Sequence, residues 1–223
     1  MSARDEIMLS IRRSLAVTGK EAPRRQAVDE RIDRAPRGVV VERSQLTGEA
    51  RLALFRQMAE ATFATVVAVD SASEVPGEVA SYLRNHNLPA TIRMGDDLRL
   101  KAMPWQSTAL DMASGPSDGR DLNSVCYAFA GVAETGTLVL TSGSANPTTL
   151  NFLPDNHIVV VNARDIAGDY EEMWTRLRFA TGKGEMPRTV NWVTGPSRSG
   201  DIEQVLLLGA HGPRRVHIIL VGN

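Results

Sequence analysis

The sequence predicts an α/β protein in three layers, with a mostly parallel sheet between two layers of helices. Along residues 45–223, apolar runs typical of strands alternate with segments of helical periodicity, and this alternation is typical of βαβ units. The run HIVVVN at residues 157–162 is apolar nearly throughout, as expected for a strand that is buried on both faces of a parallel sheet.

An N-terminal helical arm precedes this domain. Residues 3–16 carry Ile7, Met8, Ile11 and Leu15 at helical spacing, which predicts a helix that docks on the main body or on a second subunit; a helix lying on a membrane surface is the alternative. Residues 17–44 are charged and poor in large apolar side chains, so we expect a linker or a loosely packed arm. The predicted boundaries are therefore 1–44 for the arm and 45–223 for the domain.

Within the domain, each element follows from a local pattern. Pro76 marks a helix start, where its missing N–H costs nothing. The clearest helix has Tyr170, Met173, Trp174 and Leu177 on one face. In chain order, the sequence predicts a helix at 46–62, a strand at 65–70, a helix at 76–86, strands at 90–94, 124–133, 137–141 and 157–162, a helix at 168–180, a strand at 188–194, a helix at 201–208 and a strand at 215–221.

Composition excludes several classes of protein. The 223 residues carry a net charge of −1, so the overall charge does not favour nucleic acid or an anionic membrane as a partner. No run of about 18 apolar residues is present, so we expect no membrane span and a cytoplasmic protein. A single cysteine, Cys126, excludes a disulfide framework and any iron–sulfur cluster or thiolate zinc site held by this chain alone.

A turn within residues 131–143 is the first candidate site. In the segment GVAETGTLVLTSG, two apolar strands flank a turn. Glycine allows a positive φ and close approach of a ligand to the backbone, and successive N–H groups in such a turn form an anion-binding nest. The candidate ligand-binding residues are Thr135, Gly136 and Thr137, and Glu134 is the carboxylate at the junction. The alternative is a tight hairpin with Glu134 on the surface.

A second turn lies within residues 194–208, TGPSRSGDIEQVLLL. Here a strand ends and a helix is predicted to begin near Asp201, so that unpaired N–H groups and the positive end of the helix dipole face an anion. The side chain of Arg198 suits a carboxylate or a phosphate. The candidate binding residues are Gly195, Ser197, Arg198, Ser199 and Asp201. The alternative is an ordinary helix cap with a solvated Arg198.

Other polar residues complete the list of candidates. His211 lies between two glycines and could serve as a general acid or base, whereas His217 within an apolar run is expected to be a packed strand residue. Thr148 and Thr149 follow turn signals and could line a pocket, or they could cap a short helix. No motif supports a metal site, and Cys126 is expected to be a buried structural thiol.

These segments resemble a known family. GVAETGTLVL, PTTLNFLPDNHIVVV, GDYEEMW and TGPSRSGDIEQVLLLGAHGPRRVHIILV are similar to the lactate utilization protein C family, which carries the LUD domain. The resemblance extends over residues 120–222 and more weakly beyond them. It implies a fold like that of glucosamine-phosphate isomerase, ribose-phosphate isomerase and the CoA-transferases. Some relatives carry an arginine after the ETGT strand, where this chain has residues 144–149, SANPTT.

The resemblance also implies a function. It suggests a subunit of a system that oxidises L-lactate to pyruvate, together with partner proteins that carry the iron–sulfur clusters. In this hypothesis the two turns hold a small carboxylate or a phosphate-bearing ligand, and Glu134 or His211 moves a proton. Two alternatives remain open: a non-catalytic subunit that assembles the iron–sulfur partners, and a free-standing isomerase or acyl transferase of the parent fold.

Overall fold

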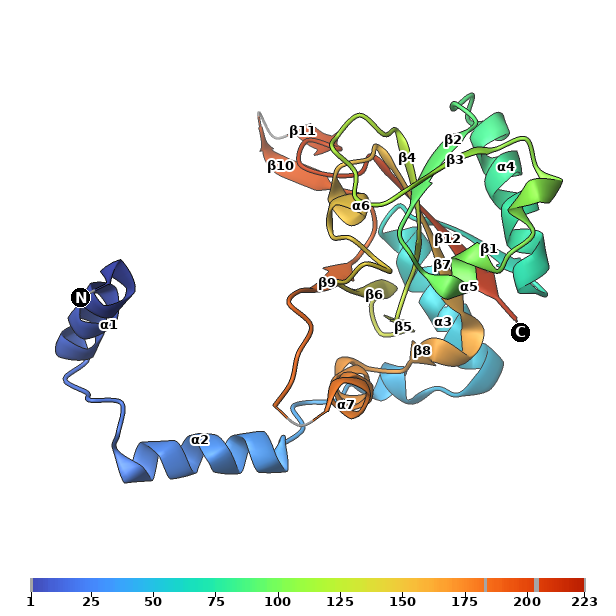
Figure 1. Ribbon diagram of the computed structural model, residues 1–223. Helices are drawn as coiled ribbons and strands as arrows, with labels where there is room; N and C mark the ends of the chain where they lie inside the picture. The colour runs from blue at the N-terminus through green and yellow to red at the C-terminus, as the bar shows by residue number, and fades with distance from the viewer. Residues whose placement is uncertain (1, 183, 203–204, 223) are drawn as a thin grey trace. The chain divides into compact units, whose positions relative to one another are not determined.

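Six strands form the main sheet of the protein, and each pairs in parallel with its neighbours (Figure 1). The structure is a computed structural model that describes residues 2–182, 184–202 and 205–222. The strand order is β1 (Thr65–Val69), β12 (Arg215–Val221), β7 (Asn156–Asn162), β4 (Asn123–Tyr127), β2 (Thr91–Met94) and β3 (Asp111–Ser114). The parallel sheet predicted from the alternating pattern is therefore present.

The chain divides into two units, Met1–Val39 and Val40–Asn223. The first contains α1 (Ala3–Ser14) and α2 (Ala22–Arg34), and none of the residues of these two helices is buried. The predicted helix at 3–16 is α1, which begins at a capping box formed by Ser2 and Asp5. Residues 17–44, expected to be a linker or a loosely packed arm, contain α2, whose first turn holds Pro23, where proline is tolerated.

Helices cover one face of the main sheet directly. They are α4 (Val75–Asn85), α5 (Leu98–Lys101) and the 3-10 helices η2 (Ala72–Glu74) and η3 (Trp105–Ser107). Leu83 and Trp105 pack there against Val125, Ile158 and Ile219 of the strands. Alternation along the strands explains this division, since successive side chains point to opposite faces.

The opposite face is covered by α3 (Gly48–Ala61), by the short helix α6 (Thr149–Phe152) and by a second, smaller sheet. Phe55 of α3 and Leu138 of the smaller sheet pack there against Val159 and Ile218 of the main sheet. The smaller sheet has the order β8 (Ile166–Ala167), β5 (Ala130–Val132), β6 (Thr137–Thr141) and β9 (Val190–Val193). It mixes parallel and antiparallel pairs, and α7 (Tyr170–Thr181) packs on it.

Several sequence predictions differ from the structure in detail. The strand expected at 124–133 is two strands, because β4 belongs to the main sheet and β5 to the smaller one. Three short elements, β3, β8 and α5, were not predicted from the sequence, and each has only two to four residues. The remaining 3-10 helices are η1 (Glu42–Gln45) and η4 (Ala163–Asp165).

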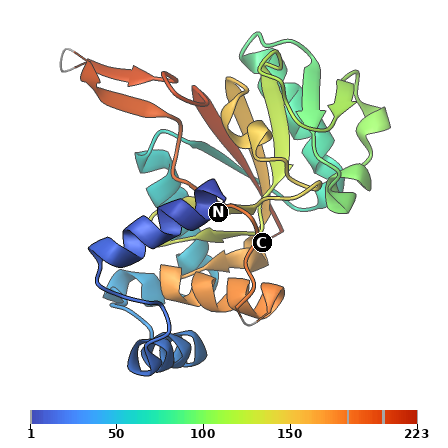
Figure 2. The same ribbon diagram turned by 60° about the vertical axis from the view of Figure 1, so that its left-hand side comes forward.

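The predicted helix at 201–208 was wrong. Residues there form β10 (Arg198–Ile202) and β11 (Val205–Leu208), an antiparallel hairpin that projects from the body at the amino end of β12 (Figure 1, Figure 2). Ile202, Val205 and Leu206 fit helical spacing, but such short apolar runs also fit strands. The N–H of Ser197 donates to the carbonyl of Pro213, and the carbonyl of Ser197 accepts a hydrogen bond from the N–H of Gly209. These two bonds hold both ends of the hairpin at the body.

Candidate functional site

The two turns singled out in the sequence lie side by side. Antiparallel pairing of β6 with β9 sets Leu138 opposite Val193, so that the preceding Thr137 and the following Thr194 also meet. Their hydroxyl oxygens are 2.7 Å apart. Both turns also pack against the C-terminal end of α3, Gly136 at Ala59 and Gly195 at Thr62.

This packing explains why both turns contain glycine. Gly136 and Gly195 have φ of +66° and +70°, in the left-handed region. A Cβ on Gly136 would lie 2.2 Å from the backbone nitrogen of Ala59, and one on Gly195 would lie 2.1 Å from the carbonyl oxygen of Thr62. Close approach to helix α3 therefore accounts for these two glycines without a ligand.

A hydroxyl network joins the two turns. The network has four members, Thr135, Thr137, Tyr170 and Thr194. The hydroxyl of Thr137 contacts those of the other three, and the hydroxyl of Thr135 also contacts that of Tyr170, with oxygen–oxygen distances of 2.6 to 3.0 Å. Each hydroxyl has one proton to donate, so these contacts can use every hydroxyl donor of the network. An anion at the ETGT turn would compete with this network for those donors.

The second turn loses its predicted helix dipole, because Asp201 lies in β10 rather than at a helix start. Its side chain is outside the described residues. Ser197 is half-buried, Ser199 lies in β10, and Arg198 is exposed with its guanidinium 5.5 Å from the centre of the Phe63 ring. The turn therefore offers a cation and a serine at the rim of the body.

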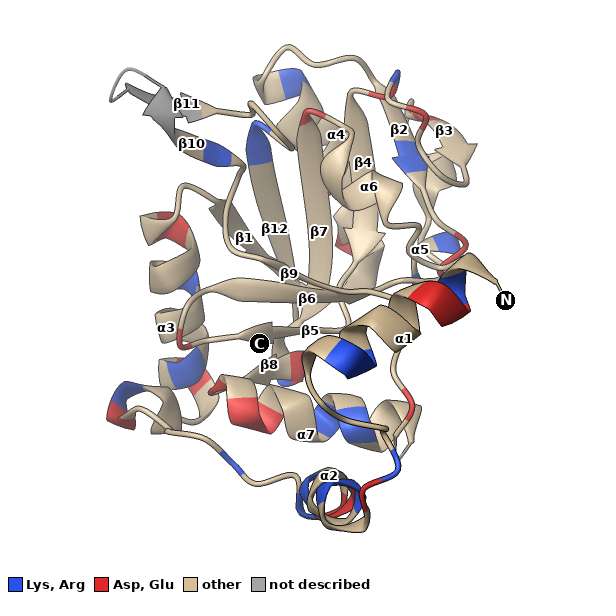
Figure 3. Cartoon of the chain, turned by 90° about the vertical axis from the view of Figure 1, so that its left-hand side faces the viewer, with Lys and Arg blue, Asp and Glu red and all other residues tan. Residues whose placement is uncertain are grey.

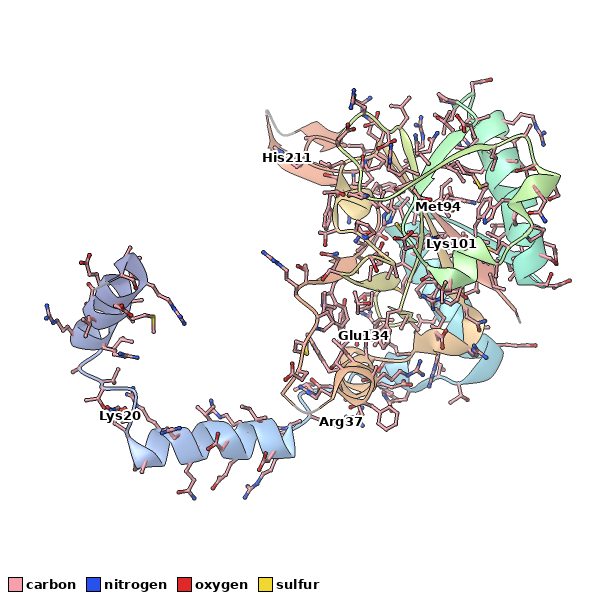
Figure 4. All side chains as sticks on the ribbon, in the orientation of Figure 1. Lys20, Arg37, Met94, Lys101, Glu134 and His211 are labelled. Carbon is pink, nitrogen blue, oxygen red and sulfur yellow. The ribbon has the colours of Figure 1, made fainter. Side chains whose placement is uncertain are left out.

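The two predicted proton-transfer residues lie in separate parts of the body (Figure 4). Glu134 is half-buried in the turn between β5 and β6, and its N–H donates to the carbonyl of Gly168. His211 is exposed in the loop between β11 and β12. Thr148 precedes α6, and the hydroxyl of Thr149 accepts a hydrogen bond from the N–H of Ser117. Glu134 therefore belongs to the first turn, and His211 lies in the loop whose Gly212 and Pro213 meet Ser197 of the second turn.

A cavity of about 400 Å³ lies at the amino ends of β1 and β12, next to the second turn. We call it the amino-edge cavity. Its lining comes from the end of α3, from β1, from α4, from the second turn and from the start of β12: Phe63, Thr65, Tyr82, His86, Pro196, Leu208, Arg214, Arg215 and Val216. The predicted segment 194–208 and the residues that follow His211 thus contribute to one cavity, although through residues other than the candidates chosen from the sequence.

Basic side chains surround this cavity. Arg214 and Arg215 line it, and Lys and Arg colour marks the start of β12 and β10 on the same side of the body (Figure 3). Arg215 donates one bond to Asn156 over 3.2 Å, and Arg214 is 3.8 Å from Asp155. Guanidinium groups retain most of their five N–H donors after one such contact, so both remain available to an oxyanion.

Aromatic rings form the floor of the cavity. The rings of Tyr82 and His217 are stacked with centres 4.1 Å apart, and the ring of His86 lies 4.3 Å from Tyr82. Nδ1 of His86 is 2.9 Å from the carbonyl oxygen of Tyr82. Because a carbonyl can only accept, Nδ1 carries the proton, and Nε2 of the neutral ring is left as an acceptor.

His217 is buried below this floor. Its Nδ1 is 2.7 Å from the hydroxyl of Thr65, and its Nε2 is 3.6 Å from a carboxylate oxygen of Glu78. Burial, with a smaller effect of His86, lowers the pKa of His217 to about 4, and burial raises the pKa of Glu78. His217 is therefore neutral at pH 7, and the expectation of a packed strand residue was correct.

Four residues of this group were not among the candidates predicted from the sequence: Thr65, Glu78, Tyr82 and His86. Glu78, Tyr82 and His86 recur every four residues on the predicted helix at 76–86, a spacing that places them on one helical face. That polar stripe was the available signal. Its partner His217 could be found only from the register that pairs Thr65 with His217.

Across the part of the chain that the structure describes, no three His, Cys, Asp or Glu side chains are grouped to hold a metal ion. Likewise, none of the described helices is long and apolar enough to cross a membrane.

Comparison with known proteins identifies similar chains. The LUD domain matches residues 124–221. Lactate utilization protein C of Deinococcus radiodurans is 30% identical over 162 residues, covering 68% of this chain and 71% of that protein. The proteins of the same name from Shouchella clausii and Geobacillus sp. are 32% and 36% identical, over 41% and 40% of this chain. These two alignments span 40% and 38% of those relatives.

A solved structure has a similar fold. The crystal structure of a DUF162 family protein from Deinococcus radiodurans superposes with a TM-score of 0.62, covering 79% of this chain and 99% of that chain. The sequence identity of 23% limits this similarity to the fold.

Proposed function

The chain belongs to the lactate utilization protein C family, and we propose that it is a subunit of a system that oxidises L-lactate to pyruvate and binds a small carboxylate in the amino-edge cavity. The observation that carries the proposal is the meeting of two arginines and a histidine, oriented by the contact of its Nδ1 with a backbone carbonyl, in one cavity of about 400 Å³. Lactate presents the complementary groups, a carboxylate and an adjacent hydroxyl.

In the proposed complex, the carboxylate pairs with the guanidinium of Arg215 or Arg214, a charge-assisted contact that arginine makes in bidentate form. The hydroxyl of lactate donates to Nε2 of His86. Arg198, next to Phe63 at the rim, adds to the positive potential that attracts the anion. Arg198, a candidate from the sequence, thus retains a role, but the main contacts with the carboxylate come from Arg214 and Arg215.

Removal of hydride or electrons from lactate requires an acceptor. The single cysteine of this sequence falls short of the several thiolates that an iron–sulfur cluster needs. We therefore propose that iron–sulfur partner proteins accept the electrons, while this chain holds the substrate. Proton transfer by Glu134 or His211 stays a prediction, and the position of His86 makes it the stronger candidate.

Isothermal titration of the full chain tests this proposal. We expect L-lactate and pyruvate to bind, and 1,2-propanediol, which keeps the hydroxyl but lacks the carboxylate, to give no heat. Arg215→Gln should weaken lactate binding at least tenfold, since a charged hydrogen bond contributes about 1.5–3 kcal/mol. Arg120→Gln is the matched control, because Arg120 is an exposed arginine paired with Asp118 elsewhere. Equal affinity in the two variants would rule out the assigned site.

The exposed apolar side chains of α1 favour a second function, assembly with other proteins. On α1, the apolar side chains of Ile7, Met8, Ile11 and Leu15 are 60, 41, 46 and 62% exposed. A contiguous exposed stripe of this kind is typical of a surface that binds another protein. We propose that residues 1–39 contribute to assembly with the iron–sulfur partners.

Truncation tests this second function. A chain that lacks residues 1–39 should keep the circular dichroism spectrum expected for the intact 40–223 unit and lose capture of the iron–sulfur partner proteins. As a control, Ile7→Asp with Ile11→Asp should reproduce the loss in the full-length chain. Unchanged capture by both chains would contradict an assembly role for this segment.

A further inference from the structure

A second group of polar side chains lies at the carboxyl edge of the main sheet, where β2 and β4 end. After β2 the chain continues outward to β3, whereas after β4 it continues in the opposite direction to β7 and then β12. In an open parallel sheet, the crevice beyond the carboxyl ends of two strands at such a reversal is where ligands bind. We call this place the switch-point crevice and define it by residues 95–99, 127 and 144–147.

One wall of the crevice presents an oriented cation. Arg99 forms a two-pronged ion pair with Asp97, with Nε–Oδ1 of 3.0 Å and Nη2–Oδ2 of 2.7 Å. The guanidinium also stacks over the ring of Tyr127, 3.7 Å from its centre. Burial raises the pKa of Asp97, but the hydrogen bonds from Arg99 outweigh it and leave the pKa below its usual value. Asp97 is therefore a fixed anion that holds Arg99 in place.

Arg99 keeps donors free for a ligand. The pair with Asp97 uses two of its five N–H groups. Within the described residues, the other three have no hydrogen-bond acceptor, and half of the side-chain surface is exposed. An arginine that is positioned by a carboxylate and a ring, with its outer edge open, is suited to an oxyanion.

The other wall supplies a buried amide without partners. Asp96 N donates to Ser144 O, and a Cβ on Gly95 would lie 2.2 Å from Ala145 O, so residues 144–147 cross directly over the end of β2. Within this segment Asn146 is 4% exposed, and neither its amide oxygen nor its amide nitrogen has a hydrogen-bond partner in the described structure.

Buried polar groups are nearly always paired. The unpaired amide of the buried Asn146 therefore indicates that a further molecule completes this site.

We propose that the switch-point crevice binds a small metabolite whose oxyanion, a phosphate or a carboxylate, takes the free N–H groups of Arg99, and whose other polar group pairs with the amide of Asn146. This site is separate from the amino-edge cavity, which lies at the opposite ends of the strands. It does not depend on the function proposed for that cavity.

Thermal denaturation of the full chain tests the inference with inorganic phosphate and with acetate as probes, each against sodium chloride at equal ionic strength. We expect one or both probes to raise the Tm. The probe that gives the larger rise identifies the oxyanion that the crevice prefers. Arg99→Gln should lower the affinity for the probe at least tenfold. Lys101→Gln, on the same helix but paired with Asp96, should stay within twofold of the natural protein.

A second variant separates a ligand site from a structural role. Asn146→Leu removes the unpaired amide at similar volume, so it should raise the Tm without probe and abolish the shift caused by the probe. The inference is overturned if neither probe stabilises the protein beyond chloride, if Arg99→Gln and Lys101→Gln behave alike, or if Asn146→Leu lowers the Tm while the probe shift persists.

Discussion

Acidification should destabilise the protein through a buried histidine whose ring has no hydrogen-bond partner among the described residues. His157, at the start of β7, is fully buried, and neither of its ring nitrogens has a hydrogen-bond partner among the described residues. Burial lowers the pKa of His157 from the ordinary 6.5 to about 3. The unfolded chain therefore binds a proton at this residue between pH 6.5 and pH 3, and the folded chain does not.

The sign and the size follow from this difference. Because the folded pKa is depressed, the free energy of unfolding is intact above pH 6.5 and falls as the pH drops toward 3. At 1.36 kcal/mol per pH unit, His157 contributes a loss of about 2 kcal/mol between pH 7 and pH 5. His217, with a pKa of about 4, acts in the same direction, while Glu78 beside it, with a raised pKa, opposes it in part.

Urea denaturation at pH 7, 6 and 5 measures this effect. His157→Leu removes the titrating group, so the loss of unfolding free energy over this range should be about 2 kcal/mol smaller than in the natural protein. Equal m-values at each pH would confirm that the same transition is followed. An unchanged loss in His157→Leu would refute the reasoning, since it would mean that His157 is not held neutral by burial.

Two further predictions concern the turns at the end of α3. Gly136→Ala should lower the free energy of unfolding by about 3 kcal/mol or more, because the added Cβ meets the backbone of Ala59; Gly143→Ala, where nothing lies within 4 Å, should have little effect in the same urea titration. Thr194→Val should cost about 1 kcal/mol through loss of its contact with Thr137, and a cost of zero would contradict the hydroxyl network.

The parallel core could be predicted from the sequence because its signals are local. Val159 and Val161 lie in a run that is apolar on both strand faces, and Met173 and Leu177 follow one face of a helix. These patterns report burial, which the structure bears out at every one of these positions. Short elements such as β8, with two residues, contain too little pattern to be recognised.

The hairpin at 198–208 shows why pattern alone fails at an edge. Ile202 and Val205 satisfy helical spacing, yet in the structure they pair across an antiparallel turn. The backbone hydrogen bonds of Ser197 with Gly209 and Pro213, which hold the two ends of the hairpin, leave no mark in the spacing of the apolar residues. Tertiary pairing here overrides the propensity signal.

The candidate sites, too, could be predicted only in part from the sequence. The sequence drew attention to the segments around Arg198 and Arg214, which do converge on one cavity. It could not identify Thr65 or His86 as their neighbours, since these lie more than 100 residues earlier in the chain. Asn146 was equally hidden, because an unpaired buried amide has no signature in sequence.

Nuclear magnetic resonance of the four histidines tests the central claim most directly. With the rings labelled with ¹⁵N and assigned by substitution, L-lactate is titrated into the full chain. We predict that the ring signals of His86, and more weakly those of its stacked neighbour His217, shift with saturation, while His157 stays unchanged. A shift confined to His211, or saturable binding that leaves His86 unmoved, would contradict binding of the carboxylate in the amino-edge cavity.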